Sequence, residues 1–205
     1  MYRLYYHPIT VALAPHIALE EIAAPYELVK VDLYGALPPG YAKLHPLGRV
    51  PVLEHDGLAM FESSAIIMHL CDRHPEAGLA PALGDPRRAH FYQWLVFAAA
   101  HLHPALKPYN YPQRFSADPA DAPAIKAKAA ETFADLFRTL ERAVDPGPYL
   151  LGDRFSACDL PLFAFTNFIE PGMTPLSAFP RLARFAERVR TRPAVGRVLG
   201  VHGLA

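Results

Sequence analysis

The chain has 205 residues, 52% of them hydrophobic and 20% charged, and its twenty Lys and Arg balance its twenty Asp and Glu, which leaves no formal net charge. This composition supplies enough apolar material for a buried core and excludes wholesale disorder, and the balanced charge argues against a general nucleic-acid binder. No apolar run approaches the roughly 20 residues that span a bilayer, so no membrane partner is expected.

The first third of the chain mixes strand and helix patterns. Residues 3–6 form a short aromatic run stopped by Pro8, which predicts a strand. Residues 12–24 carry a broad apolar face at helical spacing and predict a helix with Pro15 in its first turn. Residues 26–33 alternate and predict a second strand. Together these elements predict a β-α-β unit.

A loop and a second group of elements follow. Residues 34–47 are rich in Pro and Gly and predict a loop with a short helix. Residues 50–54 and 58–61 predict two antiparallel strands, because the Asp-Gly pair between them supplies the positive φ that tight hairpins need. Residues 63–73 predict a helix with Ser63 as its N-cap. The expected order continues as ββα.

The remaining residues show helical spacing only. Residues 77–86 are rich in Gly and Pro and predict a linker between a domain of residues 1–76 and one of residues 87–205. The predicted helices span residues 87–103, 124–144, 156–170, 181–192 and 194–199. Ser156 and Asp159 form a capping box that serves the folding of the third of them. We therefore expect a small α/β domain followed by an all-helical domain.

The N-terminus and the cysteines indicate the cellular compartment of the protein. Residues 1–6 lack the basic, apolar and small-residue regions of a signal peptide. Cys71 and Cys158 lie far apart and make neither a zinc spacing nor a disulfide framework. We expect a cytoplasmic protein with two structural thiols.

Four segments resemble, in order and at ordinary spacing, the glutathione S-transferase family. Residues 3–19 resemble the start of its bacterial members, and residues 45–53 (HPLGRVPVL) its Asn-Pro-x-Gly-x-Val-Pro-x-Leu segment. Residues 61–66 (FESSAI) resemble its Glu-Ser-x-Ala-Ile segment, and residues 152–159 (GDRFSACD) the capping segment of its second domain. The resemblance covers essentially the whole chain.

The chain departs from its most similar class in two places. It most resembles the cytosolic bacterial beta class, in which a cysteine occupies the position of Val11, and His45 stands where the family usually has Asn. The resemblance implies a thioredoxin-like βαβ-ββα domain followed by an all-helical domain. It also implies a detoxifying homodimer with glutathione as co-substrate. No metal is expected, because the ten histidines are scattered along the chain.

The resemblance also implies how glutathione is held. A cis Pro51 would leave the main chain of Val50 free to pair with the extended tripeptide. Glu62 would pair with the ligand ammonium, and Ser63 at a helix start would meet a ligand carboxylate. The expected glutathione-binding residues are His7, Arg49, Val50, Pro51, Glu62 and Ser63.

The group that activates the thiol is the open question in the sequence. A free thiol has a pKa near 8.5 and is mostly protonated at neutral pH, and Val11 has no donor to offer. Thr10 is the favoured hydroxyl, and Tyr6, His7 and main-chain donors are the alternatives. Thiol–disulfide exchange by the protein itself is disfavoured, because Val11 replaces the cysteine and the chain has no CxxC.

The electrophile is expected to bind between the domains, in a pocket whose aromatic lining suits a flat or hydrophobic compound. Pro104 follows His103 where the beta class has a basic lysine, and His101 and His103 are spaced so that they do not share a helix face or a metal. The candidate lining residues are Trp94, Phe97, His101, His103, Tyr109 and Tyr111. The alternative functions are glutathione-dependent peroxide or disulfide reduction, isomerisation, and a non-catalytic role in protein–protein contact.

Overall fold

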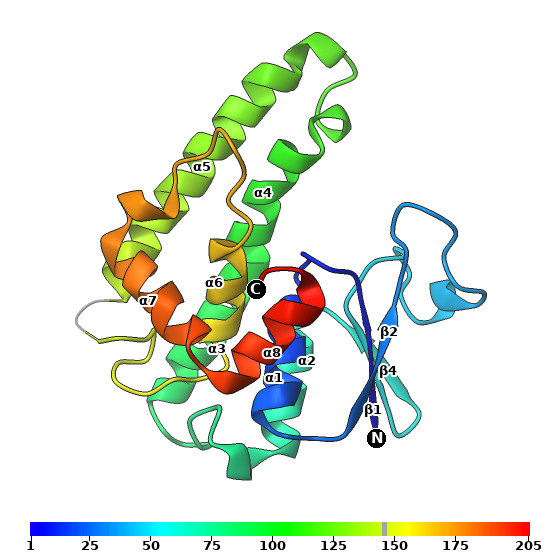
Figure 1. Cartoon of the computed structure of the whole chain (residues 1–205), viewed down its shortest axis with the longest axis vertical. Helices are drawn as coiled ribbons and strands as arrows, with labels where there is room; N and C mark the ends of the chain where they lie inside the picture. Colours follow the sequence, from blue (N-terminus) through cyan, green and yellow to red (C-terminus); the bar gives the residue numbers. More distant parts are fainter. Residues whose placement is uncertain (145–146) are drawn as a thin grey trace.

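Four strands, β1 (Tyr2–Tyr6), β2 (Tyr26–Lys30), β3 (Val52–His55) and β4 (Leu58–Phe61), form one mixed sheet in the N-terminal part of the chain (Figure 1). The computed structural model describes residues 1–144 and 147–205. The sheet order is β2-β1-β3-β4, and only the β1–β2 pair is parallel. The predicted Asp-Gly turn is confirmed, since Asp56 and Gly57 join β3 to β4 with φ of 50° and 78°.

Two helices cover one face of this sheet, and a bundle of helices follows (Figure 1). The predicted thioredoxin-like βαβ-ββα unit with an all-helical part after it is confirmed. The helices are α1 (Leu13–Glu21), α2 (Ser63–Arg73), α3 (Arg87–Phe97), α4 (His103–Asn110), α5 (Ala122–Ala143), α6 (Asp159–Thr166), α7 (Pro180–Arg190) and α8 (Pro193–His202). None of the helices described is long and apolar enough to cross a membrane.

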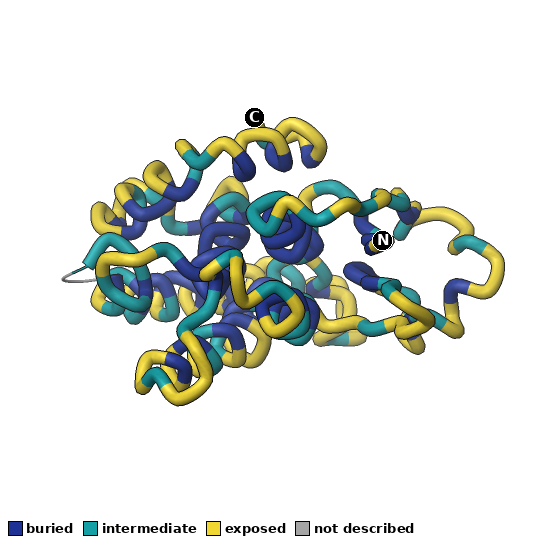
Figure 2. Tube along the Cα trace, turned by 90° about the horizontal axis from the view of Figure 1, so that it is seen from below, coloured by how far each residue is buried: buried dark blue, intermediate teal, exposed yellow. Residues whose placement is uncertain are grey.

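The main core lies where the sheet-covering helices meet the helical bundle. Leu4, at the centre of β1, is fully buried and pairs with Leu28 on one side and Leu53 on the other. In Figure 2 the buried positions gather in the middle of the molecule, and the region beyond the sheet, on the right, is mostly exposed. A second, smaller cluster of buried residues contains Tyr6 and Val50, so the loop before β3 is anchored in the fold.

Several predicted ends were wrong. The first helix was predicted to reach residue 24 but ends at Glu21, and the strand expected to reach residue 33 ends at Lys30. The helix expected to reach residue 170 ends at Thr166. Side chains end it, because Thr166 Oγ1 and Asn167 Nδ2 both donate to the Phe163 carbonyl at 2.7 Å and so take an acceptor that a longer helix would use.

The helix predicted to end at residue 103 continues to Asn110. A π-helical segment, Ala98–Leu102, joins α3 to α4. Proline lacks an N–H and clashes with the carbonyl one α-turn earlier, and the wider π turn places Pro104 in the first turn after it. The extra residue of a π turn also rotates the following helix face by about 100° relative to a continuous α-helix. The π turn therefore decides which α4 side chains face the rest of the molecule.

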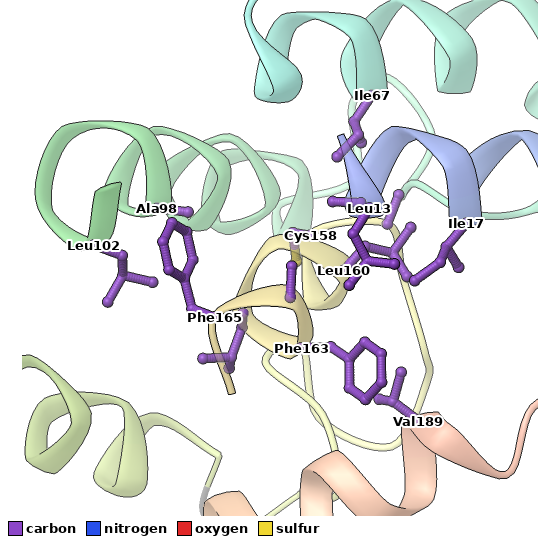
Figure 3. Close-up of a cluster of buried hydrophobic side chains, with 14 of the residues drawn as sticks. Leu13, Ile17, Ile67, Ala98, Leu102, Cys158, Leu160, Phe163, Phe165 and Val189 are labelled. Carbon is purple, nitrogen blue, oxygen red and sulfur yellow. The ribbon is translucent and has the colours of Figure 1, made fainter. Parts of the chain in front are cut away.

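Every residue of helix α6 is buried, and the helix lies in the middle of the cluster of apolar side chains in Figure 3. Its apolar side chains, including Leu160, Phe163 and Phe165, point toward α1, α2, the π segment and α7 in that view. The predicted capping box is half formed. Asp159 Oδ2 accepts from the Ser156 N–H at 2.8 Å, but the helix begins at Asp159 with Cys158 as its N-cap, three residues later than predicted.

The C-terminal helix α8 packs back onto α1 (Figure 1). His16 of α1 and His202 of α8 are each 1% exposed, and His16 Nδ1 lies 3.1 Å from His202 Nε2. Because α8 belongs in sequence to the helical part and packs on the α/β part, the limits 1–76, 77–86 and 87–205 stay a prediction. The last helix is longer than the predicted residues 194–199.

The hydrogen bonds around these histidines fix their tautomers. The Tyr26 hydroxyl donates to Glu20, so the Tyr26 oxygen accepts from His16 Nε2–H at 3.0 Å. His16 Nδ1 must then accept from His202 Nε2–H, which leaves His202 Nδ1 as a buried acceptor with no partner among the described residues. A proton added to His202 Nδ1 would be a buried charge without an acceptor, which is unfavourable.

We expect the free energy of unfolding to fall as the pH drops from about 6.5 to about 4. Burial lowers the pKa of His16 and of His202 to about 4, whereas an unfolded histidine titrates near 6.5. The unfolded chain therefore binds more protons than the folded chain in this pH range. Each of the two histidines lowers the free energy of unfolding by up to about 1.4 kcal/mol per pH unit. Urea titrations at several pH values measure the slope.

The test compares variants, because Asp159 has the opposite effect on the pH dependence of stability. Burial raises the pKa of Asp159 to about 7, so its contribution to stability grows as the pH falls. The variant His202→Gln keeps a donor toward His16 and removes one titrating ring, so its stability should depend less steeply on pH. His90→Gln removes an exposed histidine and serves as the matched control. Equal slopes in the wild type and His202→Gln would contradict this account.

Candidate active site

Two adjoining cavities lie between the α/β part and the helical part. The inner cavity, of about 220 Å³, is lined by the loop before β3, the start of α2 and one face of the π segment and α4. The outer cavity, of about 650 Å³, is lined by the loops after β1 and β2 and by the end of α4. The two share six lining residues: Val11, Leu47, Arg49, Val50, His103 and Lys107. They are therefore two chambers of one cleft.

The loop before β3 presents a free edge to the inner cavity. The Val50–Pro51 bond is cis, which confirms what the resemblance implied. The Tyr41 hydroxyl donates to the Arg49 carbonyl at 2.8 Å and fixes the loop just before Val50. Within the described residues we find no hydrogen-bond partner for the Val50 N–H or carbonyl. This main chain is available to pair with an extended peptide.

The start of α2 forms another wall of the inner cavity. Glu62 has φ of 73° and ψ of 109°, a conformation that costs a non-glycine residue about 1–3 kcal/mol and that gathers at ligand sites. Glu62 is itself the N-cap, so the prediction that Ser63 caps this helix was wrong. The Ser63 hydroxyl instead donates to the Val11 carbonyl at 3.1 Å and ties α2 to the loop after β1. The first N–H groups of α2 have no carbonyl within the helix and favour an anion.

His45 performs the local role of the asparagine that the family usually has. His45 Nδ1 accepts from the Leu47 N–H at 3.1 Å, which reproduces the bond an Asn side chain makes to the N–H two residues on. His45 is 5% exposed, packs against Phe61 with ring centroids 4.7 Å apart, and lines the inner cavity. Burial lowers its pKa, so the ring is neutral at pH 7 and Nε2 carries its proton.

The structure separates the candidates for thiol activation. Thr10 lines the outer cavity, but its hydroxyl donates to the His7 carbonyl at 2.7 Å and accepts from the Ala12 N–H at 3.3 Å. His7 lines neither cavity, and its Nδ1–H donates to the Val31 carbonyl at 2.7 Å. Tyr6 is 9% exposed, lines neither cavity and packs near His202. Of these three side chains, the structure brings only that of Thr10 to the cleft, where its proton already has an acceptor. Main-chain donors, the remaining alternative, stay open, because Val11 lines both cavities.

The predicted electrophile pocket is only partly assembled. His103 lines both cavities, and Tyr111 lines the outer one with the Arg114 guanidinium 4.4 Å from its ring centroid. Tyr109 lines neither, because its hydroxyl donates to the Pro171 carbonyl at 2.5 Å. Trp94, Phe97 and His101 also line neither cavity. Their rings contact one another in turn, edge to face and tilted, along α3 and the π segment. Their face of the helix is turned from the cleft because the neighbouring face, with Phe91 and Leu95, is in the core.

Lys107 is the cleft residue that the sequence reasoning missed. It lies one turn after His103 on α4, and both line both cavities. The i, i+4 spacing from His103 was the available signal. Burial and the nearby cations Lys107 and Arg49 lower the pKa of His103 to about 4, and burial and Arg49 lower that of Lys107. The cleft thus holds a neutral imidazole beside two basic side chains. No cluster of potential metal ligands occurs in residues 1–144 and 147–205.

A thioredoxin-like domain whose cis-proline edge faces a helical domain across a cleft defines a glutathione-binding class of protein. The models of the glutathione S-transferase N-terminal and C-terminal domains match residues 13–78 and 107–199. The chain is 28% identical to glutathione S-transferase GST-4.5 of Xanthomonas campestris pv. campestris, over 98% of this chain and 99% of that protein. It belongs to the glutathione S-transferase family.

Solved structures agree with this assignment. A glutathione transferase homologue from Sulfitobacter with bound glutathione is 30% identical and superimposes with a TM-score of 0.90, over 100% of this chain and 99% of that chain. The bacterial beta class glutathione S-transferase of Sphingomonas chungbukensis is 30% identical with a TM-score of 0.86, over 99% and 100%. The similarity extends through both parts of the fold.

Proposed function

We propose that the protein binds glutathione in the inner cavity and uses its thiolate to attack a hydrophobic electrophile in the outer cavity. One observation carries the proposal: the free Val50 main chain and the start of α2 line a chamber that opens directly into a second one. In a substitution, a sulfur–carbon bond forms while the leaving group departs with the electron pair of the bond that breaks. The thiol proton passes to solvent.

Each part of glutathione has a complementary partner in the inner cavity. The cysteinyl main chain pairs with the Val50 N–H and carbonyl as an added strand. The γ-glutamyl carboxylate accepts from the N–H groups of Ser63 and Ser64, where the helix dipole also favours an anion. The Glu62 carboxylate faces the γ-glutamyl ammonium. Arg49 binds the remaining carboxylate, that of the glycine residue of glutathione, because Arg49 lies next to Val50 and lines both cavities.

The function is tested by an ultraviolet difference titration of the protein saturated with glutathione. A thiolate band should appear well below pH 8.5, the pKa of a free thiol. Thr10, as the proposed hydroxyl donor, must turn from the His7 carbonyl to reach the sulfur, and Thr10→Val should then lower turnover of an aryl halide about tenfold. Thr10→Ser, which keeps the hydroxyl, is the control. A band that develops only around pH 8.5, as it does for free glutathione, would contradict the proposal.

We further propose that the protein is a homodimer that acts in the cytoplasm in detoxification. The half-exposed stripe of Trp94 and Phe97 and the 55% exposed Val96 on α3 favour a subunit contact. Both cysteines are free, which suits a reducing compartment. Sedimentation at micromolar concentration tests the dimer, and a monomer there would exclude it.

A further inference from the structure

The wall shared by the two cavities is the place where a bound thiol meets an electrophile. The sulfur of a peptide paired with Val50 must face the outer cavity to reach an electrophile there. A residue that contacts the sulfur in this position must therefore line both cavities. Three of the six shared residues, Val11, Leu47 and Val50, have aliphatic side chains. The polar side chains at the junction are those of Arg49, His103 and Lys107.

These three polar groups are not equivalent. His103 is neutral at pH 7, because burial and the neighbouring cations hold its pKa near 4. Arg49 is exposed, so solvent and salt screen its charge. Lys107 is half-buried, and within the described residues no carboxylate forms an ion pair with it. A partly desolvated ammonium acts more strongly on a nearby anion than an exposed one does.

The charged and titratable groups around Lys107 come from every wall of the cleft. Arg114 and Tyr111 follow α4, Glu62 precedes α2, and Glu170 follows α6, while Arg49 lies before β3. Burial, Arg49 and Arg114 lower the pKa of Lys107, and Glu62 alone among these neighbours raises it. The surroundings of Lys107 therefore favour the arrival of another negative charge.

We propose that the Lys107 ammonium holds the glutathione sulfur as its thiolate at this junction, where Val11 offers no donor. This inference rests on the proposed glutathione function. The single step involved is ionisation: the S–H bond breaks, its electron pair stays on sulfur, and its proton passes to solvent through the open outer chamber. Lys107 keeps all three of its own protons and remains an ammonium throughout.

The helix geometry explains how Lys107 comes to occupy this position. Ala98, His103 and Lys107 line the inner cavity from one face of the continuous α3–π–α4 helix. The step from Ala98 to His103 spans five residues, as does the hydrogen bond of a π turn. The step from His103 to Lys107 spans four, as does the hydrogen bond of an α turn. A regular α-helix through this segment would turn Lys107 away from the sulfur.

The experiment measures the pKa of the bound thiol by ultraviolet difference titration in Lys107→Met. We expect this pKa to rise by about one unit, the lower end of the effect of a removed opposite charge, which makes the thiolate about tenfold scarcer below the pKa. Lys107→Arg keeps the charge and should restore most of the shift. Lys43→Met removes an exposed lysine outside both cavities and should leave the pKa unchanged.

Affinity for S-methylglutathione, which has no ionisable thiol, separates this role from simple binding. The proposal expects Lys107→Met to bind S-methylglutathione within about twofold of the wild type. Weaker binding of S-methylglutathione with an unchanged thiol pKa would overturn the proposal and make Lys107 a partner of a ligand carboxylate. A protein that binds neither ligand, in the wild type as well as the variant, contradicts the proposed function itself.

Discussion

Replacement of both Glu62 and Ser63 by alanine should abolish glutathione binding in a calorimetric titration. Glu62 lines the inner cavity with a carboxylate that forms no hydrogen bond or ion pair among the residues described, so it is free to pair with the ligand ammonium. The Ser63 hydroxyl holds the Val11 carbonyl and thereby positions the start of α2. A hydrogen bond to a charged group contributes about 1.5–3 kcal/mol, so loss of the Glu62 contact alone weakens binding at least about tenfold. Loss of the tie to Val11 also displaces the N–H groups of α2 that hold the ligand carboxylate.

Single variants separate the two contributions. Glu62→Gln keeps the shape and removes the charge, and Glu62→Ala leaves the backbone strain unchanged, because alanine meets the same Cβ penalty as glutamate at φ of 73°. Ser63→Ala tests the tie to Val11. Glu131→Ala, an exposed glutamate on α5, is the control. Wild-type affinity in the double variant would remove Glu62 and Ser63 from the binding site.

The sequence predicted best those parts of the cleft that depend on local residues. The limits of β4 and α2 agree with the prediction, because an Asp-Gly turn and the His74-Pro75 pair define them without help from the rest of the chain. Segments 45–53 and 61–66, which supply residues to the inner cavity, are short and contiguous, so a local motif is enough to predict their geometry. Even the change from Asn to His at residue 45 is local in its effect, since one Nδ1 acceptor replaces an amide oxygen.

The helical side of the cleft was harder to predict because tertiary packing sets it. The predicted helix ended at His103, whereas in the structure a π segment precedes Pro104 and the helix continues beyond Lys107. Trp94 and Phe97 are of the residue type that lines an aromatic pocket. The neighbouring face of α3 packs in the core, so these two side chains point away from the cleft. Side-chain type could not show that Thr10 already donates to a carbonyl. Helical periodicity shows which residues share a face and leaves open which face meets the ligand.

Replacement of Asp159 by alanine should lower the free energy of unfolding by about 3–5 kcal/mol, near the upper limit for one substitution. Asp159 is fully buried and accepts from the Leu150 N–H at 2.9 Å and the Ser156 N–H at 2.8 Å. Alanine leaves both donors buried without a partner, and each costs about 1–3 kcal/mol. Urea unfolding measures the loss, with exposed Asp153→Ala as the matched control.

This substitution connects folding to the site. Helix α6 begins at Asp159 and lines the inner cavity with Pro161, Ala164 and Phe165, and its side chains fill the space between α1, α2 and α7 (Figure 3). A variant that still folds at low temperature should therefore bind glutathione through Val50 and Glu62 while melting far earlier than the wild type. An unfolding midpoint equal to that of Asp153→Ala would show that the two N–H groups find other acceptors.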